Sequence, residues 1–382
     1  MKKKIYLDNA ATTPLNNTVF NAMKPYLTEY YGNPSSIYIL GKKSRSAIEE
    51  SRHKVAKALN CETSEIFFTS CGTESDNWAI KGIALANKSR GNHIITSVIE
   101  HPAVKKSCEY LEYNGFAVTY LPVDEFGIIS LDTLKKSIRK ETILISIMYA
   151  NNEIGTIQPI REIGQIARKN NIYFHTDAVQ AIGNINIDVY DCKIDLLSLS
   201  AHKFNGPKGV GALYIRDGTN IYPYLHGGSQ ERDQRSGTEN VSGIVGMGKA
   251  IEISTHNIDH KTQKILSTRN LFIEAVLKNI PNAFLNGHPT IRLPGNANFT
   301  FQNVDAKYLS TILGDQGIYA SNGSACSCKS KSPSYVILAI NKTTEDASNS
   351  IRFTFSEENT DNEVKYVVDI LSKVIDYKRK NP

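Results

Sequence analysis

The sequence has little cysteine, no long apolar run and no strong charge imbalance, and each shortage excludes a class of protein. Six cysteines among 382 residues show neither the spacing of a zinc site nor the density of a disulfide scaffold, so we expect reduced thiols. No run reaches the roughly 18 apolar residues of a membrane span, and the N-terminus lacks the apolar stretch of a signal peptide. These absences favour a cytoplasmic protein with no membrane partner.

The charge and composition are those of an ordinary folded protein. A net charge of +6 is small for this length and the basic residues are scattered, which argues against direct binding to nucleic acid. Hydrophobic residues make up 41% of the chain and charged residues 21%, and 382 residues exceed one ordinary core. We therefore expect a large domain at residues 12–254 and a smaller domain made of residues 1–11 and 255–382.

Seven apolar runs rich in β-branched residues predict the strands of the large domain. Segments with helical periodicity lie between several of them, and this alternation is typical of a doubly wound, mostly parallel sheet. The last two runs have little helix between them, so a hairpin is expected there and the sheet is mixed. The seven runs are residues 65–69, 93–97, 117–123, 142–150, 172–177, 195–200 and 210–216.

The pattern changes beyond about residue 254. A long charged helix is followed by short strands that helical runs separate, which is typical of a smaller α+β domain. The fold class is thus α/β, with a seven-stranded, mostly parallel sheet in the large domain. The three short strands are expected at residues 297–301, 318–321 and 350–355.

Lys203 and Asp177 each follow a predicted strand, and in doubly wound sheets ligands bind at the carboxyl ends of the strands. A lysine amine can form a Schiff base with an aldehyde cofactor. Pyridoxal phosphate also needs a carboxylate against its pyridine nitrogen. The pair suggests such a cofactor, although either residue alone is more typical of a solvated surface or a loop start.

Other polar residues fall at neighbouring strand ends. A helix opens at Gly72 and Thr73, where free backbone N–H groups and a hydroxyl suit a phosphate, although a simple capped helix start fits as well. His101 is a candidate to lie over a flat ring or to carry a proton, or else it caps a helix. His202 and Ser200 adjoin the lysine and can donate hydrogen bonds to a phosphate oxygen.

The smaller domain contains a run of small and polar residues at about 321–333, which predicts an exposed loop. Cys326 on this loop is a candidate nucleophile, because the lysines after it favour the thiolate. Cys326 and Cys328 make a poor zinc site without a partner motif, so no metal is expected, and an incidental pair of thiols is the alternative. Arg352, in an apolar strand, can clamp a substrate carboxylate, or it is an ordinary edge-strand charge.

Read together, several motifs resemble the NifS/IscS-type cysteine desulfurases of the class V aminotransferase family. The motifs keep the order of that family over nearly the whole chain. They are YLDNAATT (6–13), GNPSS (32–36), EHP (100–102), NNEIG (151–155), SAHKFNGPKG (200–209), HGGSQE (226–231), RSGT (235–238), GSAC (323–326) and SIRF (350–353).

The resemblance implies an aspartate aminotransferase-like fold, PLP fold type I, and a homodimer. It implies pyridoxal 5'-phosphate on Lys203, with Asp177 at the pyridine nitrogen, Gln180 at the ring oxygen and His101 stacked on the ring. The implied phosphate ligands lie at the helix start that contains Gly72 and in the turn before the lysine. They are Thr73, Ser200 and His202, joined by Thr238 from the partner subunit.

The resemblance also implies the reaction. L-cysteine, held through its carboxylate by Asn152 and Arg352, would become L-alanine, and Cys326 would carry the sulfur as a persulfide to an acceptor protein of iron–sulfur cluster assembly or of a thiolation pathway. A selenocysteine lyase or another lyase or aminotransferase of this fold, or a non-catalytic scaffold for sulfur transfer, are the alternatives.

Three departures from the family pattern are visible. Tyr38 replaces a histidine, Cys71 replaces a small residue beside the phosphate site, and residues 356–359 replace a turn that contains glycine. None of these changes removes a catalytic group. They place the differences in the loops around the entrance to the site.

Overall fold

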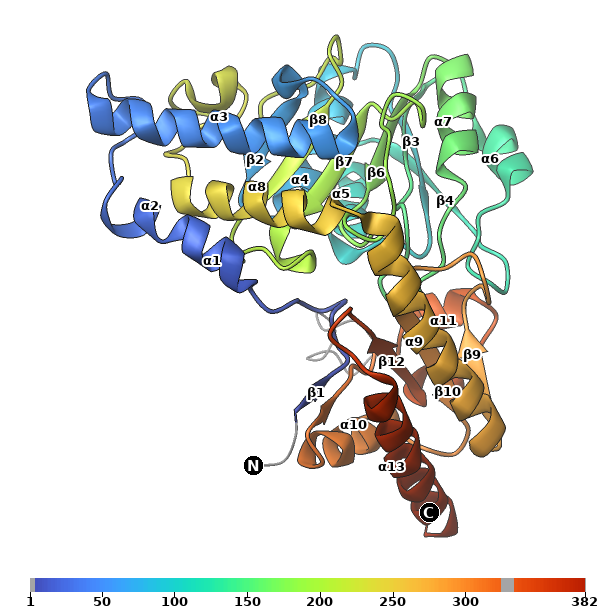
Figure 1. The fold of residues 1–382 in the computed structure, drawn as a ribbon. Coiled ribbons are helices and arrows are strands. Elements are labelled where there is room, and N and C mark those ends of the chain that lie inside the picture. The colour runs from blue at the N-terminus through green and yellow to red at the C-terminus, as the bar shows by residue number, and fades with distance from the viewer. Residues whose placement is uncertain (1–3, 324–332, 382) are drawn as a thin grey trace.

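The computed structural model describes residues 4–323 and 333–381. It consists of a large body built on a seven-stranded sheet and a smaller body built on a three-stranded sheet (Figure 1). The long helix α9 (Ile258–Asn279) descends from the large body along the smaller one, where α13 (Asp361–Lys380) packs against it.

The strand order in the large sheet is β2-β8-β7-β6-β5-β3-β4. Neighbours from β7 to β4 are parallel, whereas β8 is antiparallel to both β7 and β2. This confirms the seven strands, the hairpin and the mixed sheet that the sequence predicts. The bounds are β2 (Ile66–Thr69), β3 (His93–Ser97), β4 (Ala117–Leu121), β5 (Thr142–Ser146), β6 (Tyr173–Asp177), β7 (Leu196–Ser200) and β8 (Gly211–Ile215).

Helices cover both faces of the large sheet. Side chains of successive strand residues point to opposite faces, so Leu196 packs under α4 (Gly72–Ala86) and α5 (Pro102–Tyr113) while Leu197 packs on the other side. Because both faces are buried, the strands appear in the sequence as nearly continuous apolar runs. The opposite face is covered by α3 (Ile39–Leu59), α6 (Leu131–Ser137), α7 (Ile160–Lys169) and α8 (Val241–Thr255).

Two of the three short strands predicted in the last third of the sequence, β10 (Asn296–Phe301) and β12 (Ser350–Thr354), lie in the small sheet, whose order is β12-β10-β9, and the third is β11 in a separate two-stranded sheet. Two strands were not predicted. One is β9 (Ala283–Asn286), and the other is β1 (Ile5–Tyr6), which pairs in parallel with β11 (Ile318–Tyr319). The remaining elements are α1 (Asn17–Met23), α2 (Pro25–Thr28), α10 (Ala306–Asp315), α11 (Tyr335–Ala339), α12 (Thr344–Ser348), β10 (Asn296–Phe301), β12 (Ser350–Thr354) and the 3-10 turns Thr63–Glu65, Ala201–Lys203 and Gln230–Asp233.

A separate apolar core holds the smaller body together. Phe272 of α9 lies against Phe353 and Phe355, with ring centroids 4.9 and 5.1 Å apart, and Ile5 and Leu7 belong to the same cluster. The first residues of the chain therefore pack with its last third. These contacts support the proposed division into two domains, which stays a prediction.

No helix in the described residues combines the length and the apolar composition that a membrane crossing requires.

Gly164 lets α7 approach the loop before β7 closely, and this generates a prediction. A Cβ at this position would lie 1.9 Å from the carbonyl oxygen of Cys192, so the backbone would have to move. We expect Gly164→Ala to lower the free energy of unfolding by about 1–3 kcal/mol, the usual cost of overpacking.

The matched control is Gly314→Ala in α10, where no atom lies within 4 Å of the new Cβ. Because alanine has the higher helix propensity, this change should leave stability unchanged or raise it by up to about 1 kcal/mol. Thermal denaturation of both variants checks the pair, and equal shifts would contradict the steric argument.

Candidate active site

An open cavity of about 780 Å³ lies at the carboxyl ends of the parallel strands. Asp177 is the last residue of β6 and Ser200 the last of β7, so the topology alone brings both to this edge. The cavity gathers ten of the residues singled out in the sequence, and they come from both bodies. These residues are Gly72, Thr73, His101, Asn152, Asp177, Gln180, Ser200, His202, Lys203 and Arg352.

The start of α4 forms one wall of the cavity. The N-cap residue Cys71 makes no side-chain cap hydrogen bond, which leaves the first N–H groups of the helix without a side-chain acceptor. Gly72 packs tightly here, because a Cβ would lie 2.8 Å from Cγ2 of Val179. An uncapped helix N-terminus with Thr73 beside it attracts an anion through its N–H groups and its dipole.

Lys203 sits at the end of the short turn after β7, and the N-terminal segment crosses next to it. Its Nζ donates hydrogen bonds to the carbonyl oxygens of Ala10, at 2.6 Å, and Ala11, at 2.9 Å. Gln180 Nε2 donates to the same oxygen of Ala10, at 3.0 Å. The amine is therefore held in a defined position at the cavity wall.

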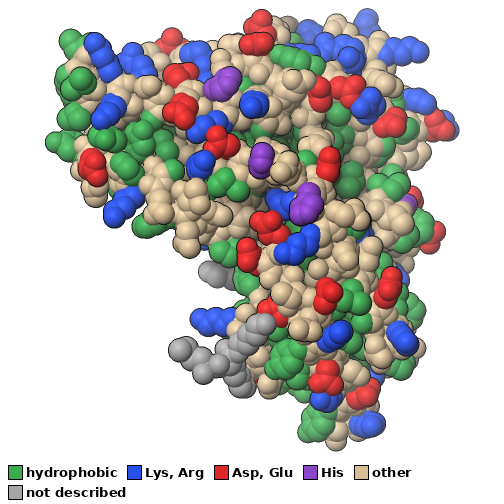
Figure 2. Space-filling model, in the orientation of Figure 1, with side chains coloured by type: hydrophobic (Ala, Val, Ile, Leu, Met, Phe, Trp, Pro, Cys, Tyr) green, Lys and Arg blue, Asp and Glu red, His purple; other side chains and the backbone are tan. Residues whose placement is uncertain are grey.

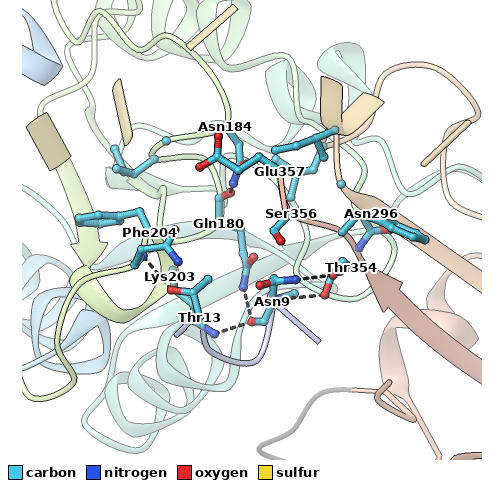
Figure 3. A pocket seen from close by; sticks show the side chains of 18 of the residues that line it. Asn9, Thr13, Gln180, Asn184, Lys203, Phe204, Asn296, Thr354, Ser356 and Glu357 are labelled. Carbon is cyan, nitrogen blue, oxygen red and sulfur yellow. Dashed lines mark hydrogen bonds between the residues drawn. The ribbon is translucent and has the colours of Figure 1, made fainter. Parts of the chain in front are cut away.

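A second cavity, of about 660 Å³, adjoins the first. Figure 3 shows it, with Lys203, Gln180 and Asn9 around it. Ala10, Gln180 and Lys203 line both cavities, so they form part of the wall between them. The segment is fixed to β12, because Asn9 Nδ2 donates to the carbonyl oxygen of Thr354 at 2.7 Å and the Ala10 N–H donates to Thr354 Oγ1 at 2.9 Å.

Asp177 is buried at the site, and His101 is partly buried beside it. Asp177 Oδ1 accepts from the N–H of Val179 at 2.9 Å. Burial raises the pKa of this carboxyl, and the charges of His101 and Lys203 oppose that rise. His101 Nδ1 accepts from the N–H of Ala103 at 3.2 Å, so the neutral ring carries its proton on Nε2. His101 thus caps α5 and lines the cavity at once.

His202 lines the cavity next to Lys203. Its Nδ1 is 3.1 Å from Oγ1 of Thr12, and burial together with the neighbouring Lys203 lowers its pKa to about 4. The ring is therefore neutral at pH 7 and has one N–H to donate. Ser200 beside it is buried, with 3% of its surface exposed.

Arg352 is a buried cation, although β12 is an edge strand of the small sheet. Only 1% of its surface is exposed, which excludes an ordinary surface charge. Its Nη2 lies 2.8 Å from Asp8 Oδ1, and its Nη1 donates to the carbonyl oxygen of Asn152 at 2.7 Å. Its Nε is inaccessible to solvent and has no hydrogen-bond partner among the described residues, whereas the side chain as a whole lines the cavity.

Comparison with known proteins decides the family. The family model for class V aminotransferases matches residues 5–367. A cysteine desulfurase IscS of Methanosarcina thermophila is 56% identical over 98% of this chain and 92% of its own length. A solved NifS-like protein is 38% identical, covers 98% of this chain and 100% of its own, and superposes with a TM-score of 0.92. The chain belongs to the cysteine desulfurases of the class V aminotransferase family.

A further solved relative, described as SspA in complex with cysteine, is 37% identical, covers 94% of this chain and 100% of its own, and has a TM-score of 0.82. The fold predicted from the resemblance, PLP fold type I, is thereby confirmed.

Pyridoxal phosphate is the cofactor of this desulfurase family, and the cavity fits it. The amine of Lys203 lies at the wall of an open cavity, a buried carboxyl stands at Asp177, and an uncapped helix N-terminus begins at Gly72. These three groups suit the three parts of the cofactor: the amine suits its aldehyde, the carboxyl its ring nitrogen and the helix N-terminus its phosphate.

Two residues singled out in the sequence are not among the residues that line this cavity. Thr238 is exposed on the surface of its own chain. Cys326, with the remainder of residues 324–332, lies outside the described residues. Ser321, shortly before it, exchanges backbone hydrogen bonds of 2.7 and 3.1 Å with Arg352. The described start of that loop is thus attached to the rim of the cavity.

Sequence reasoning missed several cavity or rim residues in this desulfurase, among them Asp76, Asp8 and Met148. Asp76 follows Gly72 by one turn of helix, so the helical period placed it on the same face. Asp8 ends a short apolar stretch, a weak signal for the partner of Arg352. Met148 lies in a run that was predicted as strand, but β5 ends at Ser146. The run stays apolar beyond the strand because Met148 is buried against the site.

Glu100, next to His101, predicts a pH dependence of stability. The side chain is fully buried, accepts from the N–H of Met148 at 3.0 Å and from Ser97 Oγ at 2.6 Å, and burial raises its pKa from 4.5 to about 8. A raised pKa means that the folded protein binds this proton more tightly. The resulting stability is complete below pH 4.5 and is lost as the pH rises to about 8.

We expect Glu100→Gln to remove this loss, because the amide keeps the hydrogen bonds and has no proton to release. The free energy of unfolding of the wild type should fall relative to this variant between pH 5 and pH 8, by at most about 1.4 kcal/mol per pH unit. Urea denaturation at both pH values measures it, with the exposed Glu125→Gln as control. Parallel curves for wild type and Glu100→Gln would disprove the assignment.

Proposed function

We propose that this protein is a pyridoxal phosphate-dependent cysteine desulfurase that converts L-cysteine to L-alanine and receives the sulfur on its own Cys326. The observation that carries the proposal is one cavity that combines Lys203, Asp177 and an anion-binding helix start with the buried Arg352. Relatives that are at least 50% identical over nearly the whole chain bear the name cysteine desulfurase IscS. A related structure was solved with cysteine, which supports this substrate.

The cofactor would be held by residues at four strand ends. Lys203 Nζ would bind it covalently, Asp177 would face the ring nitrogen, Gln180 the ring oxygen and His101 the ring. When bound, it supplies an electron sink for charge at the α-carbon of the substrate. The phosphate would lie against the start of α4, with Gly72, Thr73, Ser200 and His202 as donors from this chain.

Arg352 and Asn152 would bind the carboxylate of the substrate. The contact between Arg352 and Asp8 fixes the guanidinium plane at the cavity, so the group can receive a carboxylate without a search over rotamers. Lys203 Nζ, once it no longer holds the cofactor, is an amine that can take the proton from the α-carbon. The carbonyl oxygens of Ala10 and Ala11 keep that nitrogen in place. His101, with its proton on Nε2, is the second proton carrier.

Cys326 distinguishes this reaction from others of the same fold. Its thiolate would attack the sulfur of the substrate, forming an S–S bond while the Cβ–S bond of the substrate breaks. The electron pair of that bond stays with Cβ, which takes a proton and becomes the methyl group of alanine. A persulfide remains on Cys326 for an acceptor protein of iron–sulfur cluster assembly or of thiolation.

A homodimer would complete the site. Figure 2 shows hydrophobic side chains gathered at the end of the molecule where α2 and the start of α3 lie; there Ile37 is 86%, Ile39 80% and Tyr31 74% exposed. Large apolar side chains that are exposed together in this way fit an interface with a second copy of the chain. Thr238 is exposed and lies shortly after Arg235 in the sequence. The Nε of Arg235 lies 2.7 Å from Glu74 Oε1.

That ion pair holds the loop with Thr238 to its own subunit. A second buried pair, Arg52 with Glu231 at 2.7 Å, does the same at the start of the loop. The loop is therefore fixed while Thr238 faces outward, which suits a residue that serves the phosphate site of the partner subunit.

The decisive experiment is Cys326→Ser in the purified holoenzyme. Sulfide and alanine formation from cysteine should fall by at least about 100-fold, because the nucleophile is lost, while the visible absorption band of the cofactor stays. Cys328→Ser is the matched control and should keep activity within about 2-fold.

Two outcomes would overturn the proposal. Unaltered cysteine turnover by Cys326→Ser would disprove the persulfide mechanism and favour a lyase. Wild-type protein that gains no absorption band with added pyridoxal phosphate would show a non-catalytic scaffold.

A further inference from the structure

A second carboxyl, Asp76, is buried at the back of the cavity next to Asp177. It lies on α4, has 1% of its surface exposed and contributes to the cavity lining. One oxygen of each carboxyl and one ring nitrogen of His101 all lie within 4.8 Å of one another. Nothing in the reaction outlined above uses Asp76, so its presence beside the ring-nitrogen carboxyl needs a physical explanation.

Asp76 is sealed from solvent and short of donors. Its Oδ1 is inaccessible to solvent and has no hydrogen-bond partner among the described residues. The nearest ring nitrogen, Nε2 of His175, is 3.6 Å away from it. His175 Nδ1 lies 2.8 Å from Ser146 Oγ, and its Nε2 lies 3.0 Å from Ser198 Oγ. An ionised carboxylate would leave a bare oxygen in a dry interior, which is costly.

The charges around Asp76 do not favour its ionisation. Burial lowers the pKa of His175 to about 3, so this histidine is neutral and supplies no positive charge. Beyond burial, the groups that act on the Asp76 carboxyl through their charge are Asp177, Glu100 and Cys71, and each raises its pKa. Ser198 gives the one opposing hydrogen bond.

Asp177 has the opposite surroundings. It accepts from the N–H of Val179, and His101 and Lys203 both lower its pKa against the effect of burial. With one oxygen of each carboxyl within 4.8 Å of the other in a buried site, a charge on Asp177 raises the pKa of Asp76 and so disfavours a second charge there. The negative charge therefore belongs on Asp177, and the proton belongs on Asp76.

We propose that Asp76 is a positioning residue, a neutral carboxylic acid that donates its O–H to the Asp177 carboxylate and holds that carboxylate ionised toward the ring nitrogen of the cofactor. The inference rests on the proposed function only in that pyridoxal phosphate binds over Asp177. A carboxylic acid that donates to a carboxylate makes a charge-assisted hydrogen bond, roughly twice as strong as a neutral one. Without it, the Asp177 carboxylate becomes more basic and competes with the ring nitrogen for its proton.

The test compares Asp76→Ala with Asp76→Asn in the holoenzyme. Asparagine is neutral, nearly isosteric and still a donor, whereas alanine removes the donor. The readout is the pH dependence of the visible absorption band of the bound cofactor. Asp76→Ala should raise the midpoint of that titration by about one unit, since a tenfold change is what one such hydrogen bond provides. Asp76→Asn should stay within about 0.3 units of the wild type.

These outcomes separate the competing explanations. If Asp76 were ionised, asparagine would remove a charge and shift the midpoint as far as alanine does, which would overturn the proposal. An unchanged midpoint in Asp76→Ala would overturn it as well. Because the readout is cofactor absorption rather than sulfur release, a protein that binds pyridoxal phosphate but lacks desulfurase activity still tests Asp76.

A second measurement covers the case in which Asp76→Ala does not fold. The infrared difference between wild-type holoenzyme and Asp76→Asn at pH 8 should contain the carbonyl stretching band of a protonated carboxylic acid. Glu100 is common to both proteins and cancels in that difference. The absence of this band would show that Asp76 is ionised.

Discussion

The burial of ionisable groups at the carboxyl edge of the large sheet is the constraint on which the site depends. Asp76, Glu100, Asp177 and His175 are all nearly or fully inaccessible to water. In such an interior a charge survives only where a cation or several N–H donors face it. This requirement leaves the negative charge on Asp177, which lies beside Lys203 and His101, and keeps the other three groups neutral. The chemistry of the site thus follows from which carboxyl has a positive partner.

The N-terminal segment joins the two bodies of the protein at this edge. Ala10 accepts from Lys203 of the large body, whereas Asp8 pairs with Arg352 of the smaller one. A movement between the bodies would therefore disturb the lysine and the arginine together. With the roles proposed for Lys203 and Arg352, cofactor attachment and substrate recognition would be coupled through the four consecutive residues 8–11.

The sequence predicted the strands well where both faces of the sheet are buried. Leu196 and Leu197 face opposite cores, so the strand is a plain apolar run, whereas β1 has two residues and pairs far along the chain, so no local pattern reveals it. In the site, Lys203 and Asp177 follow from strand ends. The place of Asp76 in the site does not follow from the sequence, because an acidic residue in a helix is usually exposed to water. Cys326 follows from its loop only as a candidate nucleophile, its role as a persulfide carrier comes from the resemblance, and its position lies outside the described residues.

The pairing of β1 with β11 bears on how the protein is made. Ile5 lies opposite Ile318, so β1 finds its partner strand only after the whole of the large body between them has been synthesised. Until then the segment that carries Asp8 and Ala10 has no strand to pair with, and the large body can complete its core without it. A nascent chain can therefore fold its sheet early but acquires a closed active site only near the end of translation.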